Sequence, residues 1–120
     1  MSMINIGGLK TTSALTAILD GDVQPNAVDL RLGKVFEINE SAEFVIDEEK
    51  KVHRGSTEMT PDADGYYSFE SGKSYEVIME NEVTVGDGEA GFVITRSTLN
   101  RNGLFLTSGL YDTGYSGVMA

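Results

Sequence analysis

The pattern that most constrains the fold of this chain is a succession of short apolar segments, each bounded by a turn signal. Val28, Leu30 and Leu32 alternate with Asp29 and Arg31. A period of two residues is typical of strands with one buried face. Strands are expected at 28–32, 35–38, 43–46, 66–69, 74–85, 91–95 and 104–107. Many short strands at this spacing favour a β-sandwich or barrel.

Turns are expected at 47–49, 62–65, 71–73 and 86–88, where Asp, Glu, Gly and Ser gather. The N-terminal part differs, because the apolar residues at 14, 15, 18 and 19 follow helical spacing. Thr12 or Ser13 is the expected N-cap of this helix, and Gly21 lies just beyond its expected end. Residues 20–26 then read as a loop. The predicted fold class is all-β with one short N-terminal helix.

Length and composition narrow the function classes. A chain of 120 residues is expected to form one domain, 1–120. The net charge of −10 argues against nucleic acid and anionic membranes as partners. No long apolar run and no charged leader is present, so neither a membrane span nor secretion is expected. Cysteine is absent, which favours a cytoplasmic location, in a host cell if the source is viral.

The C-terminal quarter is an electrostatic exception. All but one of the 19 acidic side chains precede residue 90, whereas Arg96 and Arg101 follow it with Asp112. Arginine suits phosphate because its planar fork gives paired, charge-assisted hydrogen bonds. Ser97 and Thr98 add hydroxyls, and a turn after Ser97 would bring both arginines to one ligand. The alternative is an arginine-bearing surface loop.

Three further residues have both a functional and a structural interpretation. Asp112, in a glycine-rich segment, could activate water or help to hold Mg²⁺ beside a triphosphate. Tyr115 could stack on a sugar or base, but from the residues alone a β-turn with an Asp and a packed tyrosine is the favoured interpretation. Asp29 is expected on the polar side of a strand, where it either approaches a site or pairs with Arg31.

The single histidine and the absence of cysteine exclude several catalytic classes. With one histidine and no cysteine, the chain cannot build the zinc cluster of zinc-dependent nucleobase deaminases. A Cys/His triad is excluded as well, and a Ser/His/Asp triad would have to use His53. Because His53 lies in a charged stretch, it is expected to be a solvated surface residue.

Three segments resemble the dCTP deaminase/dUTP diphosphatase superfamily. Residues 24–33 read QPNAVDLRLG, which is similar to the deaminase stretch QPxSxDLRLG. Residues 96–103 read RSTLNRNG, which is similar to RSSLxRxG. Residues 109–117 read GLYDTGYSG, which is similar to the GxIDxGYxG of both branches. The segments occur in the family's order, and the resemblance runs from about residue 5 to the last residue.

The resemblance implies a distorted β-barrel, jelly-roll-like fold (the β-clip, dUTPase-like fold), usually a homotrimer with active sites between subunits. It implies dCTP or dUTP as ligand, normally with Mg²⁺ and without zinc. Carried over by position, Arg96, Ser97 and Thr98 would contact phosphates. Arg101 would contact phosphate or assist the chemistry.

The remaining roles follow from the same resemblance. Asp112 matches the acid that activates water or holds the sugar 3′-hydroxyl, and Tyr115 matches a tyrosine that packs under the deoxyribose. Asp29 matches an aspartate near the metal ion in diphosphatases. Ser97, Arg101 and Asp112 are therefore the expected catalytic residues.

The chain also departs from the family's pattern. The connection between the second and third segments is two residues shorter, and the deaminase glutamate would lie beyond Ala120. The expectation is a single dUTPase-like domain that lacks its C-terminal strands and motifs, so whether this chain is an enzyme stays open. The first hypothesis is a dCTP deaminase-like enzyme, with or without dUTP diphosphatase activity. The alternatives are a monofunctional dUTP diphosphatase and a non-catalytic nucleotide-binding or trimeric assembly module.

Overall fold

The computed structural model describes residues 5–6 and 9–120. The first residues of the predicted domain 1–120 therefore lie outside the described part. The backbone divides into two compact units. Unit 1 comprises the chain up to Arg31 together with Glu80–Ala120, and unit 2 comprises Leu32–Met79.

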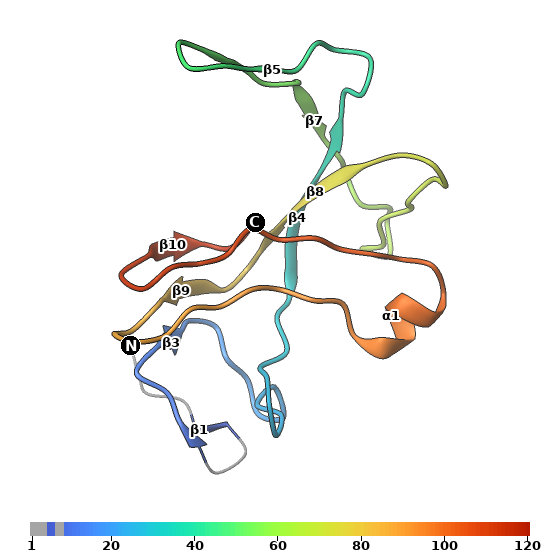
Figure 1. Ribbon diagram of the computed structural model, residues 1–120. Helices are drawn as coiled ribbons and strands as arrows, with labels where there is room; N and C mark the ends of the chain where they lie inside the picture. The colour runs from blue at the N-terminus through green and yellow to red at the C-terminus, as the bar shows by residue number, and fades with distance from the viewer. Residues whose placement is uncertain (1–4, 7–8) are drawn as a thin grey trace. The chain divides into compact units, whose positions relative to one another are not determined.

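Unit 1 contains a three-stranded antiparallel sheet built from distant parts of the sequence. Strand β9 (Glu82–Thr84) lies between β3 (Ala14–Leu15) and β10 (Ser116–Val118), as Figure 1 shows. A separate pair joins β1 (Asn5–Ile6) to β2 (Leu9–Lys10). One short helix, α1 (Ser97–Arg101), is found in the described residues, and no helix there is long and apolar enough to cross a membrane.

The apolar core of unit 1 lies around this sheet. Its buried side chains are Ala14, Val83, Val85, Tyr111 and Met119. The Tyr111 hydroxyl donates to the Ala120 carbonyl oxygen at 2.7 Å and accepts from the Ala120 amide at 2.9 Å. The chain after β10 is thereby held against the core by a buried side chain.

Unit 2 is organised around its longest strand. Strand β4 (Leu32–Ile38) lies between β7 (Ser56–Glu58) and β8 (Tyr75–Met79), and both pairings are antiparallel. Val35, opposite Val77 in the ladder, is fully buried. Strands β5 (Val45–Ile46) and β6 (Lys51–Val52) form a separate hairpin.

The predicted all-β class is confirmed, because the regular elements of the described residues are strands, apart from one short helix. The predicted strand 35–38 lies within β4, and β5 lies within the predicted strand 43–46. The predicted strand 74–85 is divided into β8 and β9, with Glu80 and Asn81 between them. The turns predicted at 47–49, 62–65, 71–73 and 86–88 fall between strands or in irregular segments.

The prediction of an N-terminal helix was wrong. Ala14 and Leu15 form β3 and pair with β9, and the Thr16 amide continues the pairing to the Glu82 carbonyl at 3.0 Å. These long-range hydrogen bonds use the backbone groups that a helix would need, and tertiary pairing overrides local helical spacing. The one helix of the described chain is α1, far along the sequence.

Three predicted strand segments are irregular instead. In segment 91–95, the Val93 amide donates to the Ser108 hydroxyl at 2.9 Å, so the ladder stops after the single bridge between Gly91 and Tyr111. Segment 104–107 forms no strand. In segment 66–69, the Tyr66 amide donates to the Asp62 carboxylate at 2.9 Å. Side-chain oxygens compete for the amides that a ladder would use.

The strand predicted at 28–32 begins only at Leu32. The preceding residues form a narrow loop closed by a bridge between Val23 and Val28. The Gln24 amide donates to the Ala27 carbonyl at 2.8 Å, across Pro25 and the residue that follows it. Asp29 therefore lies at the base of a tight loop and not on a strand.

Candidate functional site

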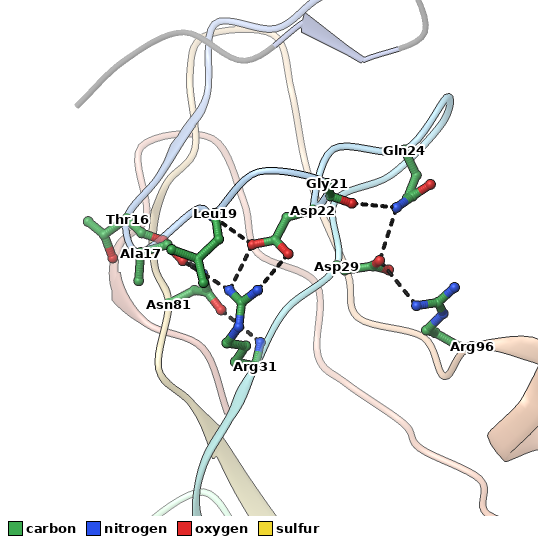
Figure 2. A network of polar contacts seen from close by, with 10 residues as sticks. All are labelled: Thr16, Ala17, Leu19, Gly21, Asp22, Gln24, Asp29, Arg31, Asn81 and Arg96. Atoms are coloured by element: carbon green, nitrogen blue, oxygen red, sulfur yellow. Dashed lines mark hydrogen bonds and ion pairs between the residues drawn. The ribbon is translucent and has the colours of Figure 1, made fainter.

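The segment 24–33 is anchored by an ion pair between its own Arg31 and Asp22, which lies just before the segment. Arg31 Nη2 and Nη1 each lie 2.7 Å from an oxygen of Asp22, whose side chain is 8% exposed (Figure 2). The Leu19 amide donates to Asp22 Oδ2 at 2.8 Å. The hydrogen bond from Arg31, with that from the Leu19 amide, holds the pKa of the Asp22 carboxyl below its ordinary value, and the same pair raises the pKa of Arg31.

Asn81 adds a hydrogen bond to this ion pair, and we call Asp22, Arg31 and Asn81 together the frame. Its side chain is fully buried, its Oδ1 accepts the Arg31 amide at 3.0 Å, and its Nδ2 donates to the Thr16 carbonyl at 2.8 Å. A second, longer contact of 3.3 Å joins Nδ2 to the Ala17 carbonyl. Asn81 thus satisfies backbone groups of two segments that lie far apart in the sequence, and it fixes where the loop after β3 begins and ends.

Asp29 faces the second arginine-bearing segment. Arg96 Nη1 lies 3.2 Å from Asp29 Oδ2, and Gln24 Nε2 donates to the same oxygen at 3.1 Å (Figure 2). Gln24 Nε2 also donates to the Gly21 carbonyl at 2.8 Å. Of the two alternatives for Asp29, the structure places it beside Arg96, while Arg31 pairs with Asp22.

Helix α1 carries the next three predicted residues. Arg96 precedes the helix in an extended conformation, with φ −65° and ψ 154°, and Ser97 and Thr98 form its first turn. Arg101 is the last helical residue. All four residues are exposed. The predicted turn after Ser97 is therefore a single helical turn, and it carries two arginines and two hydroxyls on one short surface segment.

The end of α1 explains why this segment contains a glycine. The Leu104 amide donates to the Leu99 carbonyl at 3.0 Å, and the Gly103 amide donates to the Asn100 carbonyl at 3.2 Å. This pair of bonds is a Schellman motif, which needs a residue with positive φ after the helix. Gly103 supplies it with φ +86°. The sequence around residue 103 thus fixes where Arg101 leaves the helix.

Asp112 and Tyr115 lie in a separate turn that leads into β10. The Tyr115 amide donates to the Asp112 carbonyl at 3.0 Å, and the Asp112 side chain is exposed. The rings of Tyr111 and Tyr115 lie 5.2 Å apart, and the Tyr115 hydroxyl donates to the Val118 carbonyl. This is the β-turn with a packed tyrosine that the sequence offered as one interpretation, although Tyr115 remains 38% exposed.

The Asp112 turn is fastened to a neighbouring turn. The Thr113 hydroxyl donates to the Gly86 carbonyl at 2.8 Å, and Gly86 in turn lies against Thr12. A Cβ at residue 86 would come within 2.2 Å of the Thr12 hydroxyl oxygen, so only glycine fits there. Glu89 closes the cluster by accepting bonds from the Thr11 and Thr12 hydroxyls, which lower its pKa to about 2.

The predicted residues therefore form two groups within unit 1. The first, which we call the Arg96 cluster, joins Asp29 to Arg96 and continues through α1 to Ser97, Thr98 and Arg101. The second contains Asp112 and Tyr115. Across the described residues, no hydrogen bond or ion pair links the two groups, and no three acidic or histidine side chains come together as a metal site.

Unit 2 carries a shallow hollow of a different character. It is lined by Glu37, Ile38, Asn39, Glu40, Ser41, Thr57 and Lys73. Lys73 is paired with Glu37 and Glu70, both at 3.0 Å, and these bonds raise its pKa. Because the cation is already neutralised and the lining is acidic, this hollow does not suit a polyphosphate.

The sequence did not single out Gln24, Asp22 or Asn81. Gln24 begins the segment QPNAVDLRLG, so its place in that segment was a usable signal. Asp22 lies nine residues before its partner Arg31, and Asn81 lies fifty residues after the amide it accepts. No local pattern reveals partners at such separations.

Comparison with known proteins places this arrangement in a family. A curated protein of Halobacterium salinarum, named "Probable deoxyuridine 5'-triphosphate nucleotidohydrolase", is 32% identical over 105 residues, which cover 83% of this chain and 62% of that protein. A protein of Aeropyrum pernix with the same name is 31% identical over 98 residues, covering 82% of this chain and 59% of that protein. The "Deoxyuridine 5'-triphosphate nucleotidohydrolase" of Methanocaldococcus jannaschii is 29% identical over 115 residues, covering 93% of this chain and 72% of that protein.

The chain spans less than two thirds of the length of the first two of these relatives. A family model described as dCTP deaminase-like matches residues 9–120, and this match contains the Arg96 cluster and the turn with Asp112 and Tyr115. The order of the three family-like segments and the strand-rich fold agree with that match. The chain therefore belongs to the dCTP deaminase-like family.

Proposed function

We propose that this chain binds a pyrimidine deoxynucleoside triphosphate at the Arg96 cluster, and that the whole protein hydrolyses dUTP to dUMP and diphosphate. The observation that carries the proposal is the position of Arg96. It is held on one side by Asp29 and leads directly into a helical turn with two hydroxyls and Arg101. The names of the three relatives support dUTP as substrate.

The phosphate-binding roles follow from side-chain chemistry. Arg96 and Arg101 would give charge-assisted hydrogen bonds to phosphate oxygens, and Ser97 and Thr98 would donate from their hydroxyls. These residues lie in the part of the sequence where acidic side chains are scarce, so a polyanion meets less repulsion there. Arg101 is the expected catalytic arginine, because its guanidinium would stabilise the negative charge that develops on phosphate oxygens as a phosphate bond breaks.

Asp112 and Tyr115 would act on the rest of the nucleotide. The exposed Asp112 carboxylate would take a proton from the attacking water or hold the sugar 3′-hydroxyl. Tyr115 is fixed through its hydroxyl and one neighbouring ring, and its exposed part would pack under the deoxyribose. We propose that a neighbouring subunit or ligand closure brings these two residues to the phosphates.

Mg²⁺ is proposed as the partner of the triphosphate. The contacts of Asp29 do not fit a direct metal ligand, because Gln24 and Arg96 already share its Oδ2 and the guanidinium would repel a cation. Mg²⁺ would supply neutralisation of phosphate charge when bound with the nucleotide.

Self-association as a homotrimer belongs to the same proposal. Unit 1 exposes large apolar side chains near α1, including Phe92 at 67% and Phe105 at 78% exposure. Such side chains favour an interface. Light scattering should then report three times the 13.0 kDa chain mass. The cytoplasm is the location proposed for this activity, because the chain contains no cysteine.

The second candidate reaction is deamination of dCTP to dUTP, which the description of the matching family favours. Incubation with dUTP or dCTP in Mg²⁺, followed by chromatography of the nucleotides and an ammonia assay, separates the reactions. Formation of dUMP and diphosphate from dUTP supports the first proposal, whereas ammonia and dUTP from dCTP support the second. Binding without either product would support a non-catalytic nucleotide-binding module, and no binding would contradict all three.

A further inference from the structure

We infer that Asp29 is a positioning residue that holds Arg96 ready for phosphate, and that it does not ligate the metal ion. This inference rests on the proposed nucleotide binding. It goes beyond the role that family resemblance implies for Asp29, because it assigns the carboxylate to a neighbouring guanidinium.

A series of hydrogen bonds links the backbone of Gly21 to the exposed side chain of Arg96. The Gly21 carbonyl accepts from Gln24 Nε2 at 2.8 Å, and the same nitrogen donates to Asp29 Oδ2 at 3.1 Å (Figure 2). The Asp29 amide donates to the Asp22 carbonyl at 2.8 Å, which fixes its backbone to the buried ion pair. Arg96 Nη1 then lies 3.2 Å from Asp29 Oδ2.

Exposure rises along this series of hydrogen bonds. The Asp29 side chain is 28% exposed, whereas the Arg96 side chain is 73% exposed. A long arginine side chain loses much rotamer freedom when it binds a ligand, so ordering it beforehand reduces that loss. The contact with Asp29 uses one N–H group, and an arginine has five, so donors remain for phosphate oxygens.

The metal interpretation conflicts with the same contacts. Both hydrogen-bond donors fall on Oδ2, and a cation bound to that oxygen would lie beside a guanidinium. Like charges at such distances repel strongly where water is partly excluded. A metal ion on Oδ2 of Asp29 would therefore compete with Arg96, which is the side chain that the phosphates need.

The first arm of the test uses the ligand-free protein. The Arg96 Nε–Hε signal, assigned by its loss in Arg96→Lys, should show a high ¹⁵N heteronuclear NOE in the wild type. Asp29→Asn should lower this NOE, because a neutral amide holds a guanidinium less firmly. Asp20→Asn removes the same charge from the same exposed loop and should leave it unchanged. An unchanged Arg96 NOE in Asp29→Asn would overturn the inference, whether or not the protein binds nucleotide.

The second arm measures the affinity for dUTP and for inorganic triphosphate by calorimetry. Asp29→Asn should weaken both by about fivefold to tenfold, since Arg96 must then be ordered on binding. The sign is diagnostic, because loss of a carboxylate near a polyanion would by itself strengthen binding. The control Asp20→Asn should therefore bind equally or more tightly.

Two further comparisons separate positioning from metal binding. The loss in Asp29→Asn should persist with inorganic triphosphate in EDTA, and it should vanish when Arg96 is already Ala. A loss that disappears in EDTA and persists in the Arg96→Ala background would assign Asp29 to the metal and overturn the inference. If the wild type binds neither probe, the proposed function fails, and the NOE arm still decides whether Asp29 orders Arg96.

Discussion

Two ion pairs in unit 1 use carboxylates of the same loop, and they differ in geometry and burial. Arg31 makes two contacts of 2.7 Å with the nearly buried Asp22. Arg96 makes one contact of 3.2 Å with Asp29 and stays largely exposed. An arginine that is gripped by two bonds, as Arg31 is, has little freedom left for a ligand. Arg96 makes only one hydrogen bond, so it keeps N–H donors for a ligand. The Asp22–Arg31 pair therefore stabilises the fold, whereas the Asp29–Arg96 pair leaves a guanidinium accessible to a ligand.

The largest effect is expected at the centre of the frame. Asn81→Ala removes the acceptor of the Arg31 amide and the donor to the Thr16 carbonyl, which leaves buried polar groups unsatisfied. We expect the free energy of unfolding to fall by roughly 2 to 4 kcal/mol in urea denaturation. Asn26→Ala, which changes an exposed asparagine in the loop after β3, is the matched control. An equal effect of both variants would show that Asn81 is not a structural centre.

The next largest effect is expected from the Asp22–Arg31 ion pair, and an acid titration should reveal its contribution to stability. The pKa of Asp22 is lowered in the folded protein by Arg31, so its carboxylate contributes stability at pH values above its ordinary 3.8. That contribution is lost as the pH falls below 3.8 through the folded pKa. The unfolding temperatures of the wild type and Asp22→Asn should therefore differ clearly at pH 7, and this difference should narrow steadily as the pH falls below 3.8. Glu89, with a pKa of about 2, loses its own contribution over a similar range in both proteins.

If the difference in unfolding temperature between the wild type and Asp22→Asn does not narrow in acid, the stabilising role assigned to the ionised Asp22 is contradicted. The matched variant is Asp29→Asn, which removes the carboxylate of the exposed pair. Its unfolding temperature should stay close to that of the wild type at both pH values, because exposed pairs contribute little.

The smallest effect on stability is expected at Arg96. Arg96→Ala removes one exposed ion pair, so the free energy of unfolding should change by less than about 0.5 kcal/mol. Urea denaturation checks this value beside Asn81→Ala. A large loss would mean that Arg96 is part of the frame, and the contrast between the two ion pairs would disappear.

The sequence predicted the parts of the fold that depend on local rules. The all-β class and the four turns followed from alternation and from turn residues. The predicted helix near residue 15 failed because β9 pairs with that segment from nearly seventy residues away. Helical spacing is weaker than a set of long-range backbone hydrogen bonds.

The candidate site was predictable to a similar extent. Arg96, Ser97, Thr98 and Arg101 were found from their residue types and their spacing, and they do lie together around α1. The partner of Asp29 was not predictable. The sequence suggested Arg31, two residues away, whereas the structure pairs Asp29 with Arg96, sixty-seven residues away. The roles of the site residues all stay predictions: the phosphate contacts of the residues around α1, and those of Asp112 and Tyr115, which depend on how a bound nucleotide reaches the second turn.

The central claim is that Arg96 serves a ligand and not the fold. Calorimetric titration with dUTP in Mg²⁺, with deoxyuridine and ATP as controls, tests it most directly. We predict that the wild type binds dUTP in preference to both controls, and that Arg96→Ala weakens dUTP binding by about tenfold or more, as for loss of a charge-assisted hydrogen bond. Equal dUTP affinity of the wild type and Arg96→Ala, or no binding by the wild type, would contradict it.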